Sequence, residues 1–414
     1  MSVKNIQTDA FNMTTFTLEG VNVSIANAIR RSITNDIPTW VFMTSPYEKN
    51  QATFHTNTSQ MNNELLKQRL SCIPIHMQHG YEGSIDLEDY YLEVNVENTT
   101  DDIIQVTTEH FIVKKKSDNQ PISVDVNRAI FPSYMPPDAA DAEEYFILFI
   151  RLKPRISEEI PGEKIHFTCD FSVATAKESA MFNVASTCTY GNTIDTEKAD
   201  QELSIQTQKW RDQGMSPEDI ADETANWWLL DAKRIYKPNS FDFTIQSVGV
   251  YENTQLVFLG INFIQQKIQN LLTDLDEFGD GQITIEPSLS TMENCYDIVF
   301  EDDYTLGKAI EFMLYKNYFS KDILSFCGYI KMHPHDEESI IRVAFHPSFP
   351  QAKITIEEII HMMREAIFDA EDAFIAISNV FRVEKDSSRS SSYRSSRSNR
   401  SNRSNRTNSS NNSK

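Results

Sequence analysis

Two short segments place oxygen, sulfur or imidazole side chains at spacings that could bind a metal ion. Residues 276–283 resemble a calcium-binding loop, with an acid at position five and a glycine at position six when counted from Asp276. Positions three and twelve are Phe278 and Pro287, where calcium needs oxygen ligands. We therefore interpret this segment as a tight connection between a helix and a strand.

The second segment combines Cys327 with His333, His335 and Asp336. A Cys-x5-His-x-His spacing is uncommon for zinc, and no second cysteine pair completes four ligands. No glycine-rich phosphate loop, G-x-S-x-G elbow or Asp-rich magnesium motif stands out either. The sequence therefore predicts no catalytic residue, no metal site and no cofactor.

Arg30 and Arg31 are candidates for partner binding, because planar guanidinium groups grip carboxylates and carbonyls. They fall on a short predicted helix, 25–34, which stops before Pro38. Neighbouring helical positions point about 100° apart, so we do not expect both to face one partner equally. Taken alone, the pair is better explained as two solvated charges.

Two long helical segments each carry an apolar stripe. Steps of four and three residues repeat along both, which puts every member of a stripe on one side of its helix. The first stripe comprises Val257, Ile261, Ile264, Ile268, Leu271 and Leu275, and the second comprises Ile356, Ile360, Met363, Ile367, Ala370, Phe374, Ile377 and Phe381. Each stripe needs an apolar partner, so we predict that the two face each other in a protein built from two related halves.

The remaining elements divide the chain into several parts. Strand-like stretches separated by turn residues dominate between the first 75 residues and the acidic helical stretch that breaks at Gly214. A strand and the first long helix follow, and then strands, a short helix, a strand and the second long helix. We predict a first domain at 1–75 and 238–278, an inserted β-rich domain at 76–195, an acidic helical segment at 196–237, a second domain at 279–386 and a tail at 387–414.

Charge separates the tail from the body. The chain has 414 residues, which favours two or three domains. The tail carries six arginines, one lysine and no acid, so the body holds 31 of the 38 basic residues against 60 acids, about −29. Such a body would repel nucleic acid at long range, whereas the tail, which we predict to be disordered, could contact polyanions.

No membrane span or C-x-x-C pair is visible, and we expect five reduced, buried cysteines in a reducing compartment.

Two blocks of residues in the first part of the chain resemble one protein family. The first is Asn27-Ala28-Ile29-Arg30-Arg31 followed by Asp36-Ile37-Pro38-Thr39, and the second runs from Asn57-Thr58-Ser59-Gln60-Met61-Asn62-Asn63-Glu64 to Arg69-Leu70-Ser71-Cys72-Ile73-Pro74-Ile75. They resemble the α-type subunits of cellular RNA polymerases, namely the bacterial α amino-terminal domain, the archaeal D-type protein and the eukaryotic third-largest subunit.

A third block lies in the second half. It consists of Glu301-Asp302-Asp303-Tyr304-Thr305-Leu306-Gly307-Lys308, with Cys327-Gly328-Tyr329 and His333-Pro334 downstream. The residues expected to carry the family motif are Asp303, Thr305, Leu306, Gly307, Gly328, Tyr329, His333 and Pro334. It resembles the smaller partner of these subunits, the archaeal L-type protein and the eukaryotic eleventh subunit, although His335 departs from the apolar residue usual there. The presence of both partners in one polypeptide is similar to the arrangement in large nucleocytoplasmic DNA viruses. No cysteine lies between Cys72 and Cys169, so the zinc loop or iron–sulfur cluster of some relatives is not expected.

The resemblance implies a fold and a role. The fold would be α+β, a pseudo-dimer of two α-subunit-like dimerisation domains, the first interrupted by a β-rich insert. In the family this dimer nucleates assembly of the two large catalytic subunits and performs no chemistry itself. The face that meets a large subunit would contain Asn27, Arg30 and Arg31. Glu64 and Arg69 are equally well explained by such contact or by capping and packing.

We therefore expect a non-catalytic assembly-platform subunit of a multisubunit DNA-directed RNA polymerase. Its partners would be the large catalytic subunits and small assembly subunits, with DNA and RNA contacted only through the complex and no membrane contact. A viral protein would lie in the host cytoplasm or virion, and a cellular one in the nucleus or cytoplasm. The alternative is a stand-alone interaction protein that recruits nucleic acid through its Arg/Ser-rich tail.

Overall fold

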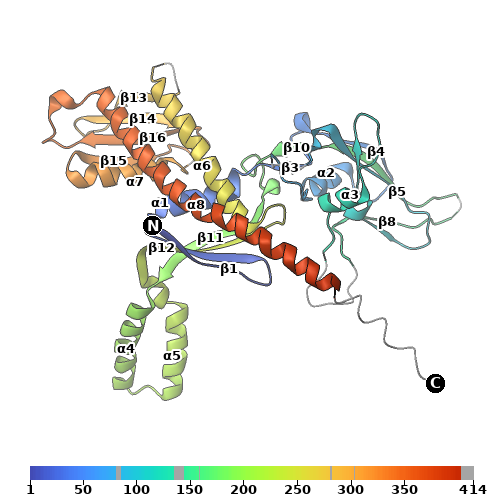
Figure 1. Ribbon diagram of the computed structural model, residues 1–414, viewed down its shortest axis with the longest axis horizontal. Helices are drawn as coiled ribbons and strands as arrows, with labels where there is room; N and C mark the ends of the chain where they lie inside the picture. The colour runs from blue at the N-terminus through green and yellow to red at the C-terminus, as the bar shows by residue number, and fades with distance from the viewer. Residues whose placement is uncertain (81–84, 135–143, 158, 280–281, 303, 402–414) are drawn as a thin grey trace. The chain divides into compact units, whose positions relative to one another are not determined.

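The computed structural model describes residues 1–401 except 81–84, 135–143, 158, 280–281 and 303, and for 383–401 it describes the backbone alone (Figure 1). The chain forms two compact units. Unit 1 comprises Met1–Ile33, Thr187–Gln246 and Asn253–Lys414, and unit 2 comprises Thr34–Ser186 and Ser247–Glu252. Helices and strands occupy separate layers in unit 1, so the predicted α+β class is confirmed.

The first sheet of unit 1 has the strand order β1-β2-β12-β11. Its strands are β1 (Ser2–Thr8), β2 (Met13–Glu19), β11 (Ala185–Ile194) and β12 (Tyr236–Ser247). β2 pairs antiparallel with both β1 and β12. Side chains alternate along β2, so Thr14, Phe16 and Leu18 are buried, and the helices α1 (Val23–Asn35) and α6 (Asn253–Asp276) follow β2 and β12 in the chain.

The second sheet of unit 1 repeats this plan. Its strands are β13 (Thr284–Pro287), β14 (Cys295–Glu301), β15 (Leu324–Ile330) and β16 (Glu338–Phe345), in the antiparallel order β13-β14-β16-β15. Helix α7 (Gly307–Asn317) follows the second strand, and α8 (Ile356–Ser401) follows the fourth. In both sheets the strands therefore lie in the order first, second, fourth, third, with a helix after the second and after the fourth.

Helices α6 and α8 pack against each other (Figure 1). At the rim of this contact Gln269 Nε2 donates to Glu371 Oε1 over 2.7 Å. α1 approaches α6 closely at Gly260, whose carbonyl accepts the Ser32 hydroxyl at 2.8 Å. A Cβ on Gly260 would lie 2.8 Å from Ile33 Cγ1, so only glycine permits this approach.

The far part of α8 lies against the first sheet. Phe381 packs edge-on against Phe16 of β2, with ring centroids 5.0 Å apart. Phe16 in turn stacks on Phe243 of β12, also at 5.0 Å. The long helix of the second half therefore packs on the sheet of the first half, and the two halves share one apolar layer.

A helical hairpin interrupts the connection between β11 and β12. It consists of α4 (Thr196–Asp212) and α5 (Pro217–Leu229), which pack on each other, and Gly214 forms the turn with φ +79°. The Ser216 hydroxyl accepts the Asp219 amide and Pro217 occupies the first turn, as the sequence pattern predicted. Of the hairpin's helical residues only Ala199 is buried, so the hairpin adds little to the core of unit 1.

Unit 2 is built on the antiparallel sheet β4-β9-β5-β7. Phe111, Phe149 and Phe167 are fully buried and contact one another in its core. The strands are β4 (Ala52–Asn57), β5 (Tyr90–Glu97), β7 (Ile112–Lys115) and β9 (Lys164–Asp170), with the two-stranded sheets β6 (Ile104–Thr107)–β8 (Leu148–Leu152) and β3 (Thr39–Val41)–β10 (Ser172–Ala174) and the helices α2 (Asn63–Ser71) and α3 (Val124–Ile130). Short 3₁₀ helices occur in both units. Those of unit 2 lie at Tyr47–Lys49, Leu87–Asp89, Thr108–His110 and Ala180–Phe182, and those of unit 1 lie at Ala232–Arg234, Phe319–Lys321 and Gln351–Lys353.

Two boundaries differ from those predicted. Residues 34–75 group with unit 2, although we placed the start of the insert at residue 76, because β4 pairs with β9 more than a hundred residues later. Helix α8 continues through Ser401, whereas we expected regular structure to end before Ser387. Residues 402–414 lie outside the described part, and disorder there stays a prediction. Within the described residues, no helix is both long and apolar enough to cross a membrane.

Candidate interaction surfaces

The predicted contact residues of the first block lie on α1, where all three are half-buried. Arg30 Nε donates to Asn27 Oδ1 at 3.0 Å, one helical turn away. Arg31 instead donates to the hydroxyl of Thr305, at 3.2 Å, in the third sequence block. As expected for adjacent helical positions, the two guanidinium groups have different neighbours. Arg31 therefore links the two halves of unit 1.

α1 and the start of α7 bury the same pattern of positions. The buried residues are Ile25, Ala26, Ala28, Ile29, Ser32 and Ile33 in the first half and Leu306, Gly307, Ala309, Ile310, Met313 and Leu314 in the second, which differ by 281 throughout. Asn27 and Arg30 then correspond to Lys308 and Glu311, which form an ion pair of their own. The equivalent helix faces of the two halves thus carry different charges.

The third sequence block forms a connected polar cluster at the start of α7. The Asp302 carboxylate accepts the backbone amides of Leu306, at 3.3 Å, and Gly307, at 2.8 Å. The Tyr329 hydroxyl lies 3.2 Å from Asp302 Oδ2 and 2.9 Å from Ser339 Oγ. Burial, reinforced by the Asp302 carboxylate, raises the pKa of Tyr329 above its usual value. Ser339 was not among the predicted residues. Asp302 belongs to the third block, but its capping role was not predicted, although an acid just before a helix is a recognisable cap signal.

Gly307 makes this cluster sterically possible. A Cβ there would lie 2.1 Å from Tyr329 Cε2 and 2.4 Å from Cδ2, so the tyrosine ring occupies the space that a side chain would fill. Thr305 and Leu306 are buried beside it. The cluster fixes the first turn of α7 against β15, which is a structural role for these predicted residues.

Other residues of the third block lie at the surface or outside the described part. His333 and Pro334 are exposed in a turn, in which the His333 carbonyl accepts the backbone amide of Asp336 at 3.0 Å. Gly328 is half-buried on β15. Asp303 lies outside the described residues.

The second block belongs to unit 2, where Glu64 and Arg69 have separate partners. Glu64 is exposed and pairs with Lys67 at 3.1 Å. Arg69 donates from Nε to the Phe149 carbonyl at 2.8 Å and from Nη2 to the Leu148 carbonyl at 2.9 Å. Arg69 therefore ties α2 to the edge of β8, which corresponds to the packing alternative.

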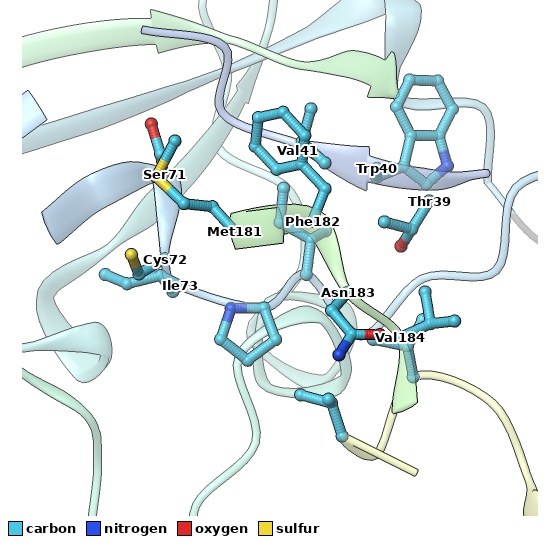
Figure 2. Close-up of a pocket in the computed structure, with 14 residues that line it drawn as sticks. Thr39, Trp40, Val41, Ser71, Cys72, Ile73, Met181, Phe182, Asn183 and Val184 are labelled. Atoms are coloured by element: carbon cyan, nitrogen blue, oxygen red, sulfur yellow. The ribbon is translucent and has the colours of Figure 1, made fainter. Parts of the chain in front are cut away.

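The end of the second block lines a small pocket of about 40 Å³ in unit 2 (Figure 2). Ile73 and Phe182 contribute apolar walls, and Thr39 and Trp40 of β3 contribute polar atoms. Neither Thr39 Oγ1 nor Trp40 Nε1 has a hydrogen-bond partner among the described residues. A pocket of this size is too small for a substrate.

The thiols do not form a metal site within the described residues, where no three His, Cys, Asp or Glu side chains lie together as potential ligands. Cys169, Cys188 and Cys295 are buried, as expected. Burial raises the pKa of Cys188 to about 12, which keeps its thiol protonated. Cys72, however, is exposed, so the expectation that all five are buried is wrong for this residue.

The two predicted stripes are buried over most of their length, with one difference. All six members on α6 are buried, as are Met363, Ile367, Ala370, Phe374, Ile377 and Phe381 on α8. Ile356, the first residue of α8, is 40% exposed and Ile360 is half-buried, while Ile359 is buried instead. A helix of 3.6 residues per turn drifts relative to a strict 3.5-residue repeat, so the buried side has rotated at this end.

Comparison with known proteins agrees with these observations. Residues 15–268, more than half of the chain, match the RNA polymerase Rpb3/Rpb11 dimerisation domain. The chain belongs to this family. The match begins in β2 and ends in α6. It takes in most of β2, the strands β11 and β12, unit 2 and the hairpin, whereas β1 precedes it and the second sheet lies beyond it.

Individual relatives are distant, and two of them are matched over most of their own length. The chain is 22% identical to the DNA-directed RNA polymerase subunit Rpo3 of Pyrococcus furiosus over 277 residues, which are 63% of this chain and 92% of that protein. It is 24% identical to the DNA-directed RNA polymerases I and III subunit RPAC1 of Bos taurus over 314 residues, 66% and 85% of the two chains. A shorter match to Rpo3 of Pyrococcus horikoshii is 33% identical over 85 residues, 20% of this chain and 30% of that protein. The resemblance to α-type subunits is thereby confirmed.

Proposed function

We propose that this chain is a non-catalytic, Rpb3-like structural subunit of a multisubunit DNA-directed RNA polymerase, in which both partners of the α-like dimer are fused. Residues 1–278, with unit 2 as an insert, form the first partner, and residues 279–386 form the second. The pair acts as a platform on which the large catalytic subunits and small subunits assemble. DNA and RNA are reached only through that complex.

One observation carries the proposal, namely the repetition of the same plan in the two halves of unit 1. Both sheets have the strand order first, second, fourth, third, and the burial patterns of α1 and α7 match at a constant offset. The long helices that end each repeat, α6 and α8, pack on each other through buried apolar residues. Such pairing of two copies of one domain is what a fused dimer requires.

The α1 face is the proposed contact with a large subunit. Arg30 is half-buried, and its Nε donates to Asn27 one turn earlier on the same helix, so part of its side chain is accessible to a partner. Arg31 contributes a hydrogen bond to Thr305 and so also supports the fold. Because the equivalent face of α7 carries Lys308 and Glu311, the two halves differ in charge and would select different partners.

Affinity purification of the full-length chain, with mass spectrometry of co-purifying proteins, tests the proposal. We expect large polymerase subunits in stoichiometric amounts with the unaltered chain. Arg30→Glu should reduce their recovery at least tenfold with little change in melting temperature. Arg31→Glu should reduce recovery and also lower the melting temperature. Arg211→Glu, the same charge change at an exposed position on α4, is the matched control and should change neither.

Two results would contradict the proposal. If Arg30→Glu leaves the recovery of the large subunits unchanged, α1 is not the helix that contacts them. Absence of large subunits, together with nucleic-acid binding that disappears when residues 387–414 are deleted, would favour the stand-alone interaction protein instead.

A further inference from the structure

The outer face of the second sheet has a composition unlike that of a solvated sheet. α7 packs on β15 and β16 on the inner side, where Ile298, Tyr329 and Ile341 are buried. Side chains of a strand alternate between faces, so the neighbouring positions point outward. Those outward residues include Val299 and Ile340, which are half-buried, and Ile330, which is 46% exposed.

The three aliphatic residues form one continuous row across the sheet. Val299 of β14 pairs with Ile340 of β16, and Ile340 pairs with Ile330 of β15. Side chains at paired positions on one face lie about 5 Å apart, so the row is an unbroken apolar stripe across three strands. Phe326 lies on the same outer face of β15 but in a different row, opposite Ala344, and is 39% exposed.

The neighbouring row on the outer face contains an ion pair between Asp297 of β14 and Arg342 of β16. Arg342 donates to Asp297 in a two-pronged contact, Nε to Oδ1 at 2.6 Å and Nη2 to Oδ2 at 2.7 Å. The hydrogen bonds from Arg342 hold the pKa of Asp297 below its usual value. Phe326 closes the end of this row, because a Cβ on Gly328 would lie 2.9 Å from its Cζ.

The first sheet provides an internal comparison, because its strands follow the same order. If Phe16 is matched with Ile298 and Phe243 with Ile341, which are paired inward residues in each sheet, then Thr17 and Asp242 stand where Val299 and Ile340 stand. Thr17 donates to Asp242 at 2.8 Å, and Thr193 donates to the same oxygen at 3.0 Å. The same fold therefore accepts a polar outer face, and the apolar residues of the second sheet are not required by the fold.

Exposed acids surround the apolar stripe. Glu286, Glu301 and Glu338 point outward from β13, β14 and β16, and all three are exposed. Their charge favours a basic partner, as does the charge of about −29 on residues 1–386. A sheet face of this kind is normally covered by a helix, as the inner face of the same sheet is.

We propose that the outer face of the second sheet, which we call the β13–β15 face, is a docking surface for a basic amphipathic helix of a partner protein. The apolar side of that helix covers Val299, Ile340, Ile330 and Phe326, and its lysines or arginines reach the surrounding glutamates. The proposal does not depend on the polymerase role, since it rests on the sheet alone.

Site-specific photocrosslinking in the full-length chain provides the first test. A photoreactive phenylalanine analogue at Phe326 should crosslink to a segment, identified by mass spectrometry, with apolar residues at helical spacing and flanking lysines or arginines. The same analogue at Thr15, on the outer face of the first sheet, is the control and should give no such product. Crosslinks to a second copy of this chain or to residues 387–414, or no crosslink from Phe326, would overturn the proposal.

A defined peptide provides the second test. The probe is a synthetic helix with leucines on one side and lysines on the other, and a leucine–glutamate helix is its charge-reversed control. The double variant Val299→Thr and Ile340→Asp, which copies the residues of the first sheet, should bind the lysine probe at least tenfold more weakly. Because the new aspartate adds attraction for a basic probe, such a loss identifies the apolar contact.

Each outcome of the titration is decisive. Equal binding of the lysine probe to the unaltered chain and the double variant, or equal binding of the two peptides to the unaltered chain, would contradict the proposed surface. Melting temperatures confirm that the double variant is folded. If it is not, Ile330→Thr at the exposed end of the stripe replaces it, with the same expected direction.

Discussion

Replacing Gly307 with alanine should destabilise unit 1, although helix propensity predicts the opposite sign. Alanine is favoured over glycine in a helix by up to about 1 kcal/mol. At Gly307, however, the added methyl group would lie 2.1 Å from Tyr329 Cε2. The ring is not free to move, because its hydroxyl lies 2.9 Å from Ser339 Oγ and accepts the Tyr304 amide at 3.1 Å.

The magnitude follows from these contacts. Overpacking costs about 1–3 kcal/mol, and displacing the ring breaks hydrogen bonds worth about 1 kcal/mol each. After the propensity gain is subtracted, we expect Gly307→Ala to lower the free energy of unfolding by about 2–4 kcal/mol. Urea denaturation followed by circular dichroism measures this change. Gly191→Ala is the matched control and should stay within about 0.5 kcal/mol, since nothing lies within 4 Å of its added Cβ.

A double-mutant cycle separates the steric cause from any other. In a Tyr329→Ala background the methyl group has room, so Gly307→Ala should be neutral or stabilising by up to about 1 kcal/mol. The same loss in both backgrounds would refute the steric explanation. So would an increase in stability from Gly307→Ala alone.

Two further substitutions test the packing and the electrostatics of unit 1. Ile264→Ala, in the buried stripe of α6, should lower the free energy of unfolding by about 2–5 kcal/mol in thermal or urea denaturation. Gln266→Ala, on the exposed side of α6, should be nearly neutral. Equal effects of the two substitutions would show that the stripe is not the packed side of α6. Arg342 lowers the pKa of Asp297 in the folded state. The ion pair therefore stabilises the fold fully above the unfolded-state pKa of about 4, and this stabilisation is lost as pH falls through the lower folded-state pKa. Asp297→Asn should therefore lower the melting temperature at pH 7, with a difference that shrinks below about pH 4; a difference independent of pH between about 3 and 7 would argue against the ion pair.

The sequence predicted the long helices well, because their apolar residues recur at one spacing over many turns. It did not show that Ile356 would be exposed, since a stripe drawn at 3.5 residues per turn ignores the drift of a real helix. It also missed β15. That strand carries Phe326 and Ile330 on one face and Tyr329 on the other, so the alternation of apolar and polar residues that identifies a strand is absent.

One strand and the role of one predicted site residue could not be read from the sequence, because both depend on contacts in the folded chain. β1 was missed because its pairing with β2 shifts register between Lys4 and Gln7, around Asn5 with φ +56°. Arg69 was left between two explanations because its acceptors, the carbonyls of β8, lie about eighty residues away in the chain. Long-range pairs of this kind leave no local pattern in a single sequence.

The α4–α5 hairpin has a practical consequence for isolating whatever complex this chain enters. Its turn at Gly214 is exposed, and nothing lies within 4 Å of that residue's added Cβ. The corresponding connection in the second half, between β15 and β16, needs only residues 331–337. An epitope inserted at Gly214 would therefore lengthen a segment that the sheet can do without, and it would leave both termini, α1 and the β13–β15 face unaltered during purification.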